Sequence, residues 1–246
     1  MRRIIKALPL VAAIGIAGDA GGIGQTQRDV TQIFDIYLGG LWIAEMDVSA
    51  NIGQSDYRAE AALRTKGIVE LIYEASFEAE VEGTVEDARL ATGTFRADSR
   101  DTRKSQFVEM TYRDGRPTDL RAEPAFKPKP WEIEPQAQID TADPLSAAIE
   151  ALNPPAGVAL CNRRVDVFDG RKRYRIVMGE PESRDGGLVR CPALYQRIAG
   201  FKPKKMIQPD YPFEFWFEPT PGGGHRILRA MGETPLGTAV IRQREN

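Results

Sequence analysis

The segment DYRAEAALR, residues 56–64, alternates apolar and charged side chains over most of its length. This period of two is typical of a β-strand that buries one face and exposes the other. Its apolar phase consists of Tyr57, Ala59, Ala61 and Leu63. The same alternation occurs in SFEAEVEG at 76–83 and in FEFWFE at 213–218. These segments predict half-buried strands and therefore a β-sheet fold.

Turn signals connect further alternating segments into hairpins. Gly-Gly at 39–40, Asp-Gly at 114–115 and Asp-Gly at 169–170 each stand between two alternating segments, as tight hairpin turns do. Two more strands are predicted at 225–231 and 237–243. The chain is therefore predicted to form a large antiparallel sheet.

Two segments predict short helices. DPLSAAIEAL, residues 143–152, offers Asp143 as N-cap and Pro144 at the first helical position. GIVELIYEA, residues 67–75, has apolar residues at helical spacing. About two short helices cannot flank a large sheet on both faces, so the sheet must curl and cover itself. We expect a mainly β fold with a curled, half-barrel-like antiparallel sheet.

The concave side of such a sheet is the candidate ligand site. Large aromatic residues and small alanines share the apolar phase of the strands that we expect to face inward, and alanines leave volume that something else must fill. Either a ligand fills it, or Leu145, Ile149 and Leu152 of the predicted helix do. The candidate ligand-binding residues are Trp42, Tyr57, Ala59, Ala61, Phe213, Phe215 and Phe217.

The N-terminus has the three-part pattern of a secretory signal. Basic Arg2, Arg3 and Lys6 precede an apolar run that is too short to span a bilayer, and small residues follow up to Ala20. We predict a signal peptide at 1–20, a flexible linker at 21–30 and a single β-rich domain at 31–246. No later segment predicts a membrane span. The expected location is the periplasm, free of a lipid anchor.

Export bears on the two cysteines of the chain, Cys161 and Cys191. An oxidising compartment favours a disulfide, and a zinc site would need more ligands than the single histidine, His225, supplies. A disulfide closing this loop would contribute roughly 3.6 kcal/mol. In a plain three-strand meander the two residues would lie about 9.5 Å apart, which is too far for a bond. A disulfide therefore predicts that the chain near Cys191 folds back beside Cys161, either by a bend or by pairing on its other edge.

Charge excludes one class of partner and leaves another open. The chain has 33 basic and 35 acidic residues, and losing residues 1–20 would leave 30 and 34, a net charge of −4. This balance gives no support to nucleic-acid binding. The predicted hairpin that contains Arg171, Lys172 and Arg173 is either a contact for anionic lipid head groups or a well-solvated hairpin. The echo of FKPKPW at 126–131 in FKPKK at 201–205 is interpreted as coincidence.

No catalytic constellation is evident in the sequence. His225 lies in a glycine-rich turn, and no G-x-S-x-G motif presents a serine. Carboxylates alternate with apolar residues as on a solvated strand face. A glycosidase pair would come together only in space, so a carbohydrate-active hydrolase stays an alternative. We predict no metal and no cofactor.

Three longer segments resemble a known family. FDIYLGGLWIAEMDV at 34–48, CNRRVDVFDGRKRYRI at 161–176 and CPALYQRIAGFKPKK at 191–205 are similar to a periplasmic family of Gram-negative bacteria known as domain of unknown function 3108. The resemblance implies an envelope location and β architecture without a reaction. More distantly, an exported curled sheet resembles the half-barrels of the lipoprotein carriers LolA and LolB and the sensor RseB, which is a likeness of fold alone.

These observations favour a non-enzymatic envelope protein. Its concave sheet would bind a lipid acyl chain or a segment of a partner, such as a lipoprotein or another envelope protein, and we expect a monomer. The first alternative is a structural or sensory interaction module with a filled core and no ligand. The second is the hydrolase.

Overall fold

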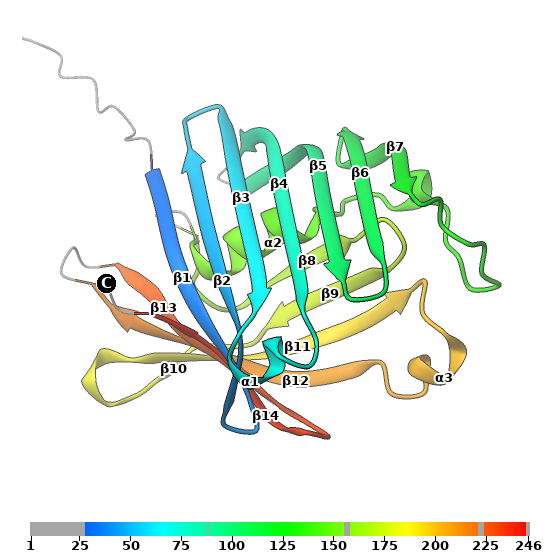
Figure 1. Ribbon diagram of the computed structural model, residues 1–246. Helices are drawn as coiled ribbons and strands as arrows, with labels where there is room; N and C mark the ends of the chain where they lie inside the picture. The colour runs from blue at the N-terminus through cyan, green and yellow to red at the C-terminus, as the bar shows by residue number, and fades with distance from the viewer. Residues whose placement is uncertain (1–27, 88, 155–157, 221–223, 245–246) are drawn as a thin grey trace, which may run out of the picture.

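The computed structural model describes residues 28–87, 89–154, 158–220 and 224–244, and these form one large antiparallel sheet of 14 strands that does not close into a barrel (Figure 1). The strand order is β7-β6-β5-β4-β3-β2-β1-β14-β13-β12-β11-β9-β8, and β10 pairs with β11. The predicted fold class is confirmed.

The strands fall into two groups along the chain. The first comprises β1 Arg28–Leu38, β2 Leu41–Ile52, β3 Asp56–Thr65, β4 Ala75–Glu86, β5 Arg89–Asp101, β6 Ser105–Arg113 and β7 Arg116–Glu123. The second comprises β8 Arg163–Phe168, β9 Arg173–Met178, β10 Glu182–Ser183, β11 Val189–Ala199, β12 Asp210–Pro219, β13 His225–Thr234 and β14 Gly237–Gln243. The helices are α1 Gly67–Glu70, α2 Pro144–Leu152 and α3 Pro203–Met206, with 3₁₀ turns η1 Pro135–Ala137 and η2 Asp185–Gly187.

The three predicted hairpin turns are present. They join β1 to β2, β6 to β7 and β8 to β9. Asp114 and Gly115 both have positive φ angles, 51° and 68°, as do Gly39 and Gly40 at 56° and 84°. Two consecutive residues of this kind match the right-handed twist of the flanking strands, which explains the Asp-Gly and Gly-Gly pairs.

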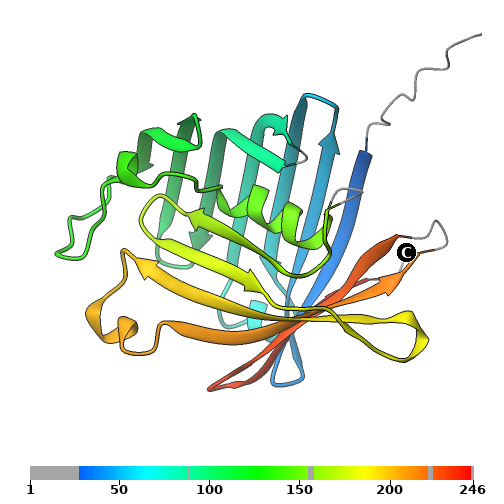
Figure 2. The same ribbon diagram turned by 180° about the vertical axis from the view of Figure 1, so that it is seen from behind.

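The two strand groups fold over each other with α2 between them. In Figure 1, β1 to β7 run upright while the strands of the second group run across, and Figure 2 shows α2 in the space that they enclose. The free edge of β8 is partly covered because Ala142 donates to the Asp166 carbonyl at 2.9 Å and accepts from the Phe168 amide at 3.0 Å. A Cβ at Gly170 would lie 3.2 Å from Val108 of β6, so the β8–β9 turn packs against the opposite end of the sheet.

Helix α2 matches the prediction from its sequence. The Asp143 carboxylate accepts hydrogen bonds from the amides of Leu145 at 2.8 Å and Ser146 at 3.0 Å, as an N-cap does. Leu145 and Ile149 lie in the same buried cluster as Ala59. The helix therefore fills the space beneath β3, β4 and β5, where the sequence left open either a helix or a ligand.

The helix predicted at 67–75 is wrong in its length. Only α1, Gly67–Glu70, forms there, and none of its residues is buried. Leu71 and Ile72 are 86% and 80% exposed. A short amphipathic segment gains its helical stability from burying an apolar face, and this one has nothing to pack against. Residues 71–74 are instead part of the loop that joins α1 to β4.

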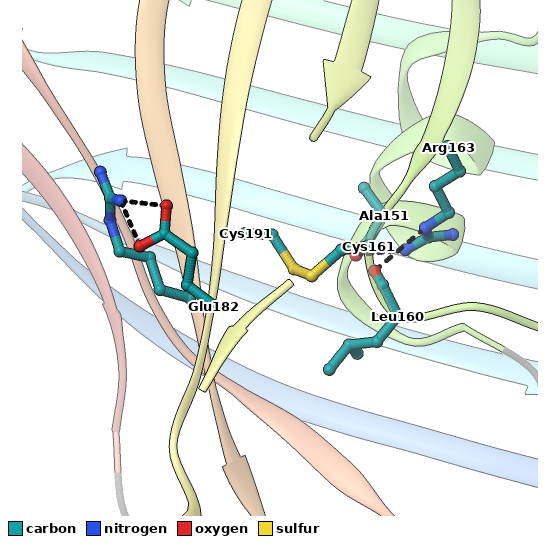
Figure 3. The surroundings of a disulfide bond; sticks show 7 residues. Ala151, Leu160, Cys161, Arg163, Glu182 and Cys191 are labelled. Atoms are coloured by element: carbon teal, nitrogen blue, oxygen red, sulfur yellow. Dashed lines mark hydrogen bonds and ion pairs between the residues drawn. A yellow bond between two sulfur atoms is a disulfide. The ribbon is translucent and has the colours of Figure 1, made fainter. Parts of the chain in front are cut away.

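Cys161 and Cys191 form a disulfide, with Cα atoms 5.5 Å apart (Figure 3). Strand β9 lies between β8 and β11 but ends at Met178, short of Cys191. Asn162 donates to the Gly179 carbonyl at 2.8 Å, so the chain before β8 bends past the end of β9. The predicted disulfide is present. The bend that permits it lies at Cys161, whereas the prediction placed it near Cys191, which sits within the regular strand β11.

The predicted signal peptide at 1–20 lies outside the described residues, as does most of the linker predicted at 21–30. Strand β1 begins at Arg28, so residues 28–30 belong to the sheet. No helix in the described part of the chain is long and apolar enough to cross a membrane.

Candidate functional site

An apolar cleft of about 510 Å³ runs along the side of α2 that faces away from β3, β4 and β5. Its walls come from α2, β1, β2, β8, β9 and β11 to β14. The main apolar lining residues are Phe34, Met46, Ala147, Ala148, Ala151, Leu152, Val167, Tyr174, Ile176, Tyr195, Tyr211, Phe213, Phe215, Ile227, Ala230, Met231, Ala239 and Ile241. The volume lies within the range of about 300–1,000 Å³ that is usual for small-molecule sites.

The residue sizes on α2 explain why the space is filled on one side of the helix and open on the other. Leu145 and Ile149 point into the core and are 6% and 1% exposed. Ala147, Ala148 and Ala151 also line the cleft, but only Ala148 is exposed, whereas Ala147 is buried against Val167 of β8 and Ala151 is buried in the core. Since a methyl group occupies much less volume than a branched side chain, the helix leaves a gap to the sheet at Ala148.

A buried polar network fixes the N-terminal end of α2. Thr92 of β5 donates to the Asp143 carboxylate at 2.7 Å, and the Ser146 hydroxyl also hydrogen-bonds to that carboxylate. The hydroxyls of Ser146 and Tyr57 lie 2.5 Å apart. Burial raises the pKa of the Asp143 carboxyl. Because each polar group has a partner, the network positions the helix and leaves no free nucleophile.

The C-terminal half of α2 is held equally well. Glu150 accepts from the Leu90 amide at 2.6 Å, and burial raises the pKa of this carboxyl. Asn153 and Gln32 exchange two side-chain hydrogen bonds at 3.0 and 3.1 Å. Arg163, next to the disulfide, donates to the Ala151 carbonyl at 2.8 Å (Figure 3). The helix is therefore a fixed partition within the fold.

Aromatic rings line the wall opposite the helix. The rings of Tyr174 and Tyr195 lie 4.9 Å apart, those of Tyr195 and Tyr211 lie 6.3 Å apart, and those of Phe213 and Phe215 lie 5.0 Å apart. Burial raises the pKa of Tyr195 to about 12 and raises that of Tyr174 as well. Both phenols stay neutral at physiological pH, so neither adds charge to this wall.

The mouth of the cleft lies where β12, β13 and β14 approach their turns. Tyr211, Pro212, Glu233 and Thr234 line the cleft and are exposed. Glu233 is the one carboxylate among the described lining residues. The interior is thus apolar, and the polar groups gather at the entrance.

The structure separates the seven predicted ligand-binding residues. Phe213 and Phe215 line the cleft. Phe217 is wholly buried in the core. Tyr57 and Ala59 lie on the side of the sheet that α2 covers, as predicted for the concave side, but the helix fills the space in front of them, so they do not line the cleft. The half-buried Ala61 packs beside them. The path of α2, which decides which side is filled, is not encoded in the alternation of the strands.

Trp42 lies outside the cleft for a different reason. Ile36 pairs with Ala44, whereas the next residue, Tyr37, pairs with Trp42. Ile43 is therefore an extra residue, and this β-bulge reverses the phase of the alternation beyond it. Trp42 is 38% exposed beside the loop that contains α1.

Sequence reasoning missed Tyr174, Tyr195 and Tyr211. Each lies two residues from a cleft-lining or buried apolar residue on its own strand, namely Ile176, Ala193 and Phe213. That shared phase was the available signal. No sequence pattern indicates, however, that β9, β11 and β12 lie opposite α2. The place of the three tyrosines on the cleft wall therefore follows only from the folded structure.

The three basic residues predicted to contact anionic head groups lie in two different surroundings. Arg171 and Lys172 line a separate surface pocket of about 250 Å³. Arg173 instead pairs with Asp166 at 3.2 Å, as does Arg175 at 2.9 Å. The side chain of Arg173 is therefore engaged within the sheet.

A further hollow, of about 550 Å³, lies outside the apolar cleft and is lined by several charged side chains of β2 to β5. Its carboxylates are largely paired with arginine. Arg96 contacts Glu80 at 3.1 Å and Glu109 at 2.5 Å. His225 is exposed at the start of β13. Across the part of the chain that the structure describes, no group of three or more His, Cys, Asp or Glu residues could hold a metal.

Comparisons with known proteins support the fold and assign no activity. A crystal structure of a beta-barrel-like protein of the domain of unknown function DUF1849, from Brucella abortus, is similar with a TM-score of 0.51 and 14% identity, over 89% of this chain and 98% of that chain. A search of the curated proteins returns no match. The family model described as "Protein of unknown function (DUF3108)" matches residues 33–243. The chain therefore belongs to the DUF3108 family.

Proposed function

We propose that this protein is an exported, non-enzymatic component of the bacterial envelope that binds an acyl chain in the cleft beside α2. The observation that carries the proposal is the cleft itself, with its volume of about 510 Å³, its aromatic and aliphatic walls and its polar mouth. Such a site suits a ligand with an apolar body and a polar end. The signal pattern in the sequence supports a periplasmic location.

The driving force would be the removal of the chain from water. Each buried methylene contributes about 0.8 kcal/mol, so a chain of eight to twelve carbons would bind measurably even after the cost of immobilising it. The fixed position of α2 helps because a preformed site loses less entropy when the ligand binds.

An apolar segment of a partner protein is the second candidate for the same cleft, favoured by the exposed residues Tyr211 and Pro212 at its mouth. The core beneath β3 to β5 is filled by α2, which is the arrangement expected for the alternative of an interaction module without a ligand. A hydrolase has less support. The single carboxylate among the described residues that line the cleft, Glu233, does not make the facing pair that glycoside hydrolysis requires.

Two measurements test the proposal. Protein exported with its own N-terminus and purified without detergent should carry lipid that mass spectrometry detects after extraction. Alkyl maltosides of eight to twelve carbons should then bind the delipidated protein with an affinity that rises steadily with chain length. An affinity independent of chain length, together with the absence of lipid, would contradict acyl-chain binding.

A further inference from the structure

Two distant loops with nearly the same sequence meet at one place on the surface. FKPKPW at 126–131 follows β7, and FKPKK at 201–205 follows β11. The Lys202 ammonium lies 6.0 Å from the centre of the Trp131 ring, and both residues line one pocket of about 250 Å³. The two similar segments, whose likeness was interpreted as coincidence in the sequence, thus contribute to a single site.

The β8–β9 turn forms the third side of this pocket. The Arg171 guanidinium stacks 4.6 Å from the Phe126 ring centre and donates to the Lys127 carbonyl at 3.1 Å. The Lys172 ammonium lies 5.9 Å from the centre of the Phe201 ring. A Cβ at Gly200, whose φ is +84°, would clash with the Arg171 carbonyl oxygen, so glycine is needed for the loop to approach this closely.

The pocket concentrates positive charge in an acidic protein. Its basic lining residues are Lys129, Arg171, Lys172, Lys202 and Lys205. The carboxylates nearby are Glu132, 4.0 Å from Arg171, and Asp169, 3.8 Å from Lys172. Five cations therefore face two carboxylates, whereas the whole chain has a net charge of −2. An excess of donors of this kind suits a compact anion with several acceptor oxygens, which is the chemistry of a phosphate group.

Arg197 joins this pocket to the cleft. Its guanidinium lies 5.5 Å from the Phe201 ring centre in the pocket and 4.2 Å from the Tyr211 ring centre at the mouth of the cleft. The same side chain donates to the Tyr211 hydroxyl at 2.5 Å and to the Lys205 carbonyl at 3.0 Å. The basic pocket and the entrance of the apolar cleft are thus neighbours, and Arg197 contacts a lining residue of each.

We infer that the basic pocket binds a phosphate group, and that this phosphate belongs to the head of an amphiphile whose chain occupies the cleft. The second half of this inference rests on the proposed function, while phosphate binding stands on the pocket alone. The apolar cleft would supply affinity for the chain, and the pocket would select ligands with an anionic phosphate head over neutral ones.

The test compares three probes on the delipidated full-length mature protein: dodecyl phosphate, dodecyl maltoside and inorganic phosphate. Calorimetric titration at low ionic strength and pH 8 keeps the phosphate monoester doubly charged, since its second pKa is about 6. Dodecyl phosphate should bind at least about ten-fold more tightly than dodecyl maltoside. Inorganic phosphate should compete with dodecyl phosphate and leave the binding of the maltoside unchanged.

The variant Lys172→Gln/Lys202→Gln removes two exposed charges from the pocket and should abolish the preference for dodecyl phosphate. Arg103→Gln/Lys104→Gln removes two exposed charges from the β5–β6 turn and should preserve it. Equal binding of both dodecyl probes, unaffected by the pocket variant, would overturn the inference and leave the acyl-chain proposal standing. Inorganic phosphate binding that depends on Lys172 and Lys202, without any maltoside binding, would support the phosphate site and contradict the acyl-chain proposal.

Discussion

The two faces of α2 differ in what they meet. On one face, Leu145 and Ile149 pack into the core with Ala59 of β3. On the other, the exposed Ala148 faces an apolar cleft. One helix of nine residues therefore separates a filled region from an open one. Side-chain size along a single helix therefore determines where the curled sheet keeps open space.

The largest loss of stability should come from shortening a side chain on the buried face of α2. Ile149 is 1% exposed, so Ile149→Ala should lower the free energy of unfolding by about 2–5 kcal/mol because it opens a new cavity. Leu152→Ala on the cleft side should cost clearly less, since the space beside that residue is already open. Urea denaturation measures both. Equal losses would show that the two faces are packed alike.

Removing the disulfide should lower the stability of the protein near the C-terminal end of α2. Cys161→Ala/Cys191→Ala opens a cross-link between residues 30 apart, which costs about 3.6 kcal/mol in the chain-entropy model. The unreduced wild-type protein should show no free thiol, and the melting temperature of the variant should fall. Quantitative labelling of both thiols in the unreduced native protein would contradict the cross-link.

A smaller effect should appear in the pH dependence of stability. Burial raises the pKa of the Glu150 carboxyl, so its contribution to stability is fully present below its ordinary pKa and is lost as pH rises through the raised value. Glu150→Gln keeps an acceptor for the Leu90 amide but cannot ionise. Relative to wild type, the variant should therefore gain stability as pH rises from about 4.5. A difference in the free energy of unfolding that is constant with pH would contradict this.

The fold could be predicted from local pattern because strand alternation, Asp-Gly turns and the Asp143-Pro144 cap are all encoded within a few residues. The helix at 67–75 was predicted too long because its apolar residues have no surface to pack against in the folded protein. Whether such a surface exists depends on the tertiary structure. The bulge at Ile43 reversed the phase for Trp42 without a sequence signal.

The site was only partly predictable for the same reason. Phe213 and Phe215 were found because they lie on the inward phase of a long strand. The choice between a ligand and the helix as the filler could not be made from sequence, because α2 fills one half of the space and leaves the other open. The convergence of the loops at 126–131 and 201–205 likewise depends on how the sheet curls.

A pair of tryptophan substitutions tests the difference between the two faces most directly. Ala59→Trp should overpack the filled side and cost roughly 1–3 kcal/mol or more. Ala148→Trp, at an exposed position in the cleft, should leave the stability near that of wild type and reduce the binding of dodecyl maltoside at least about ten-fold. Ala62→Trp, away from the cleft, serves as the control and should change neither property markedly. If Ala148→Trp binds the probe as wild type does, or if it destabilises the protein as much as Ala59→Trp, the open face is not a ligand site.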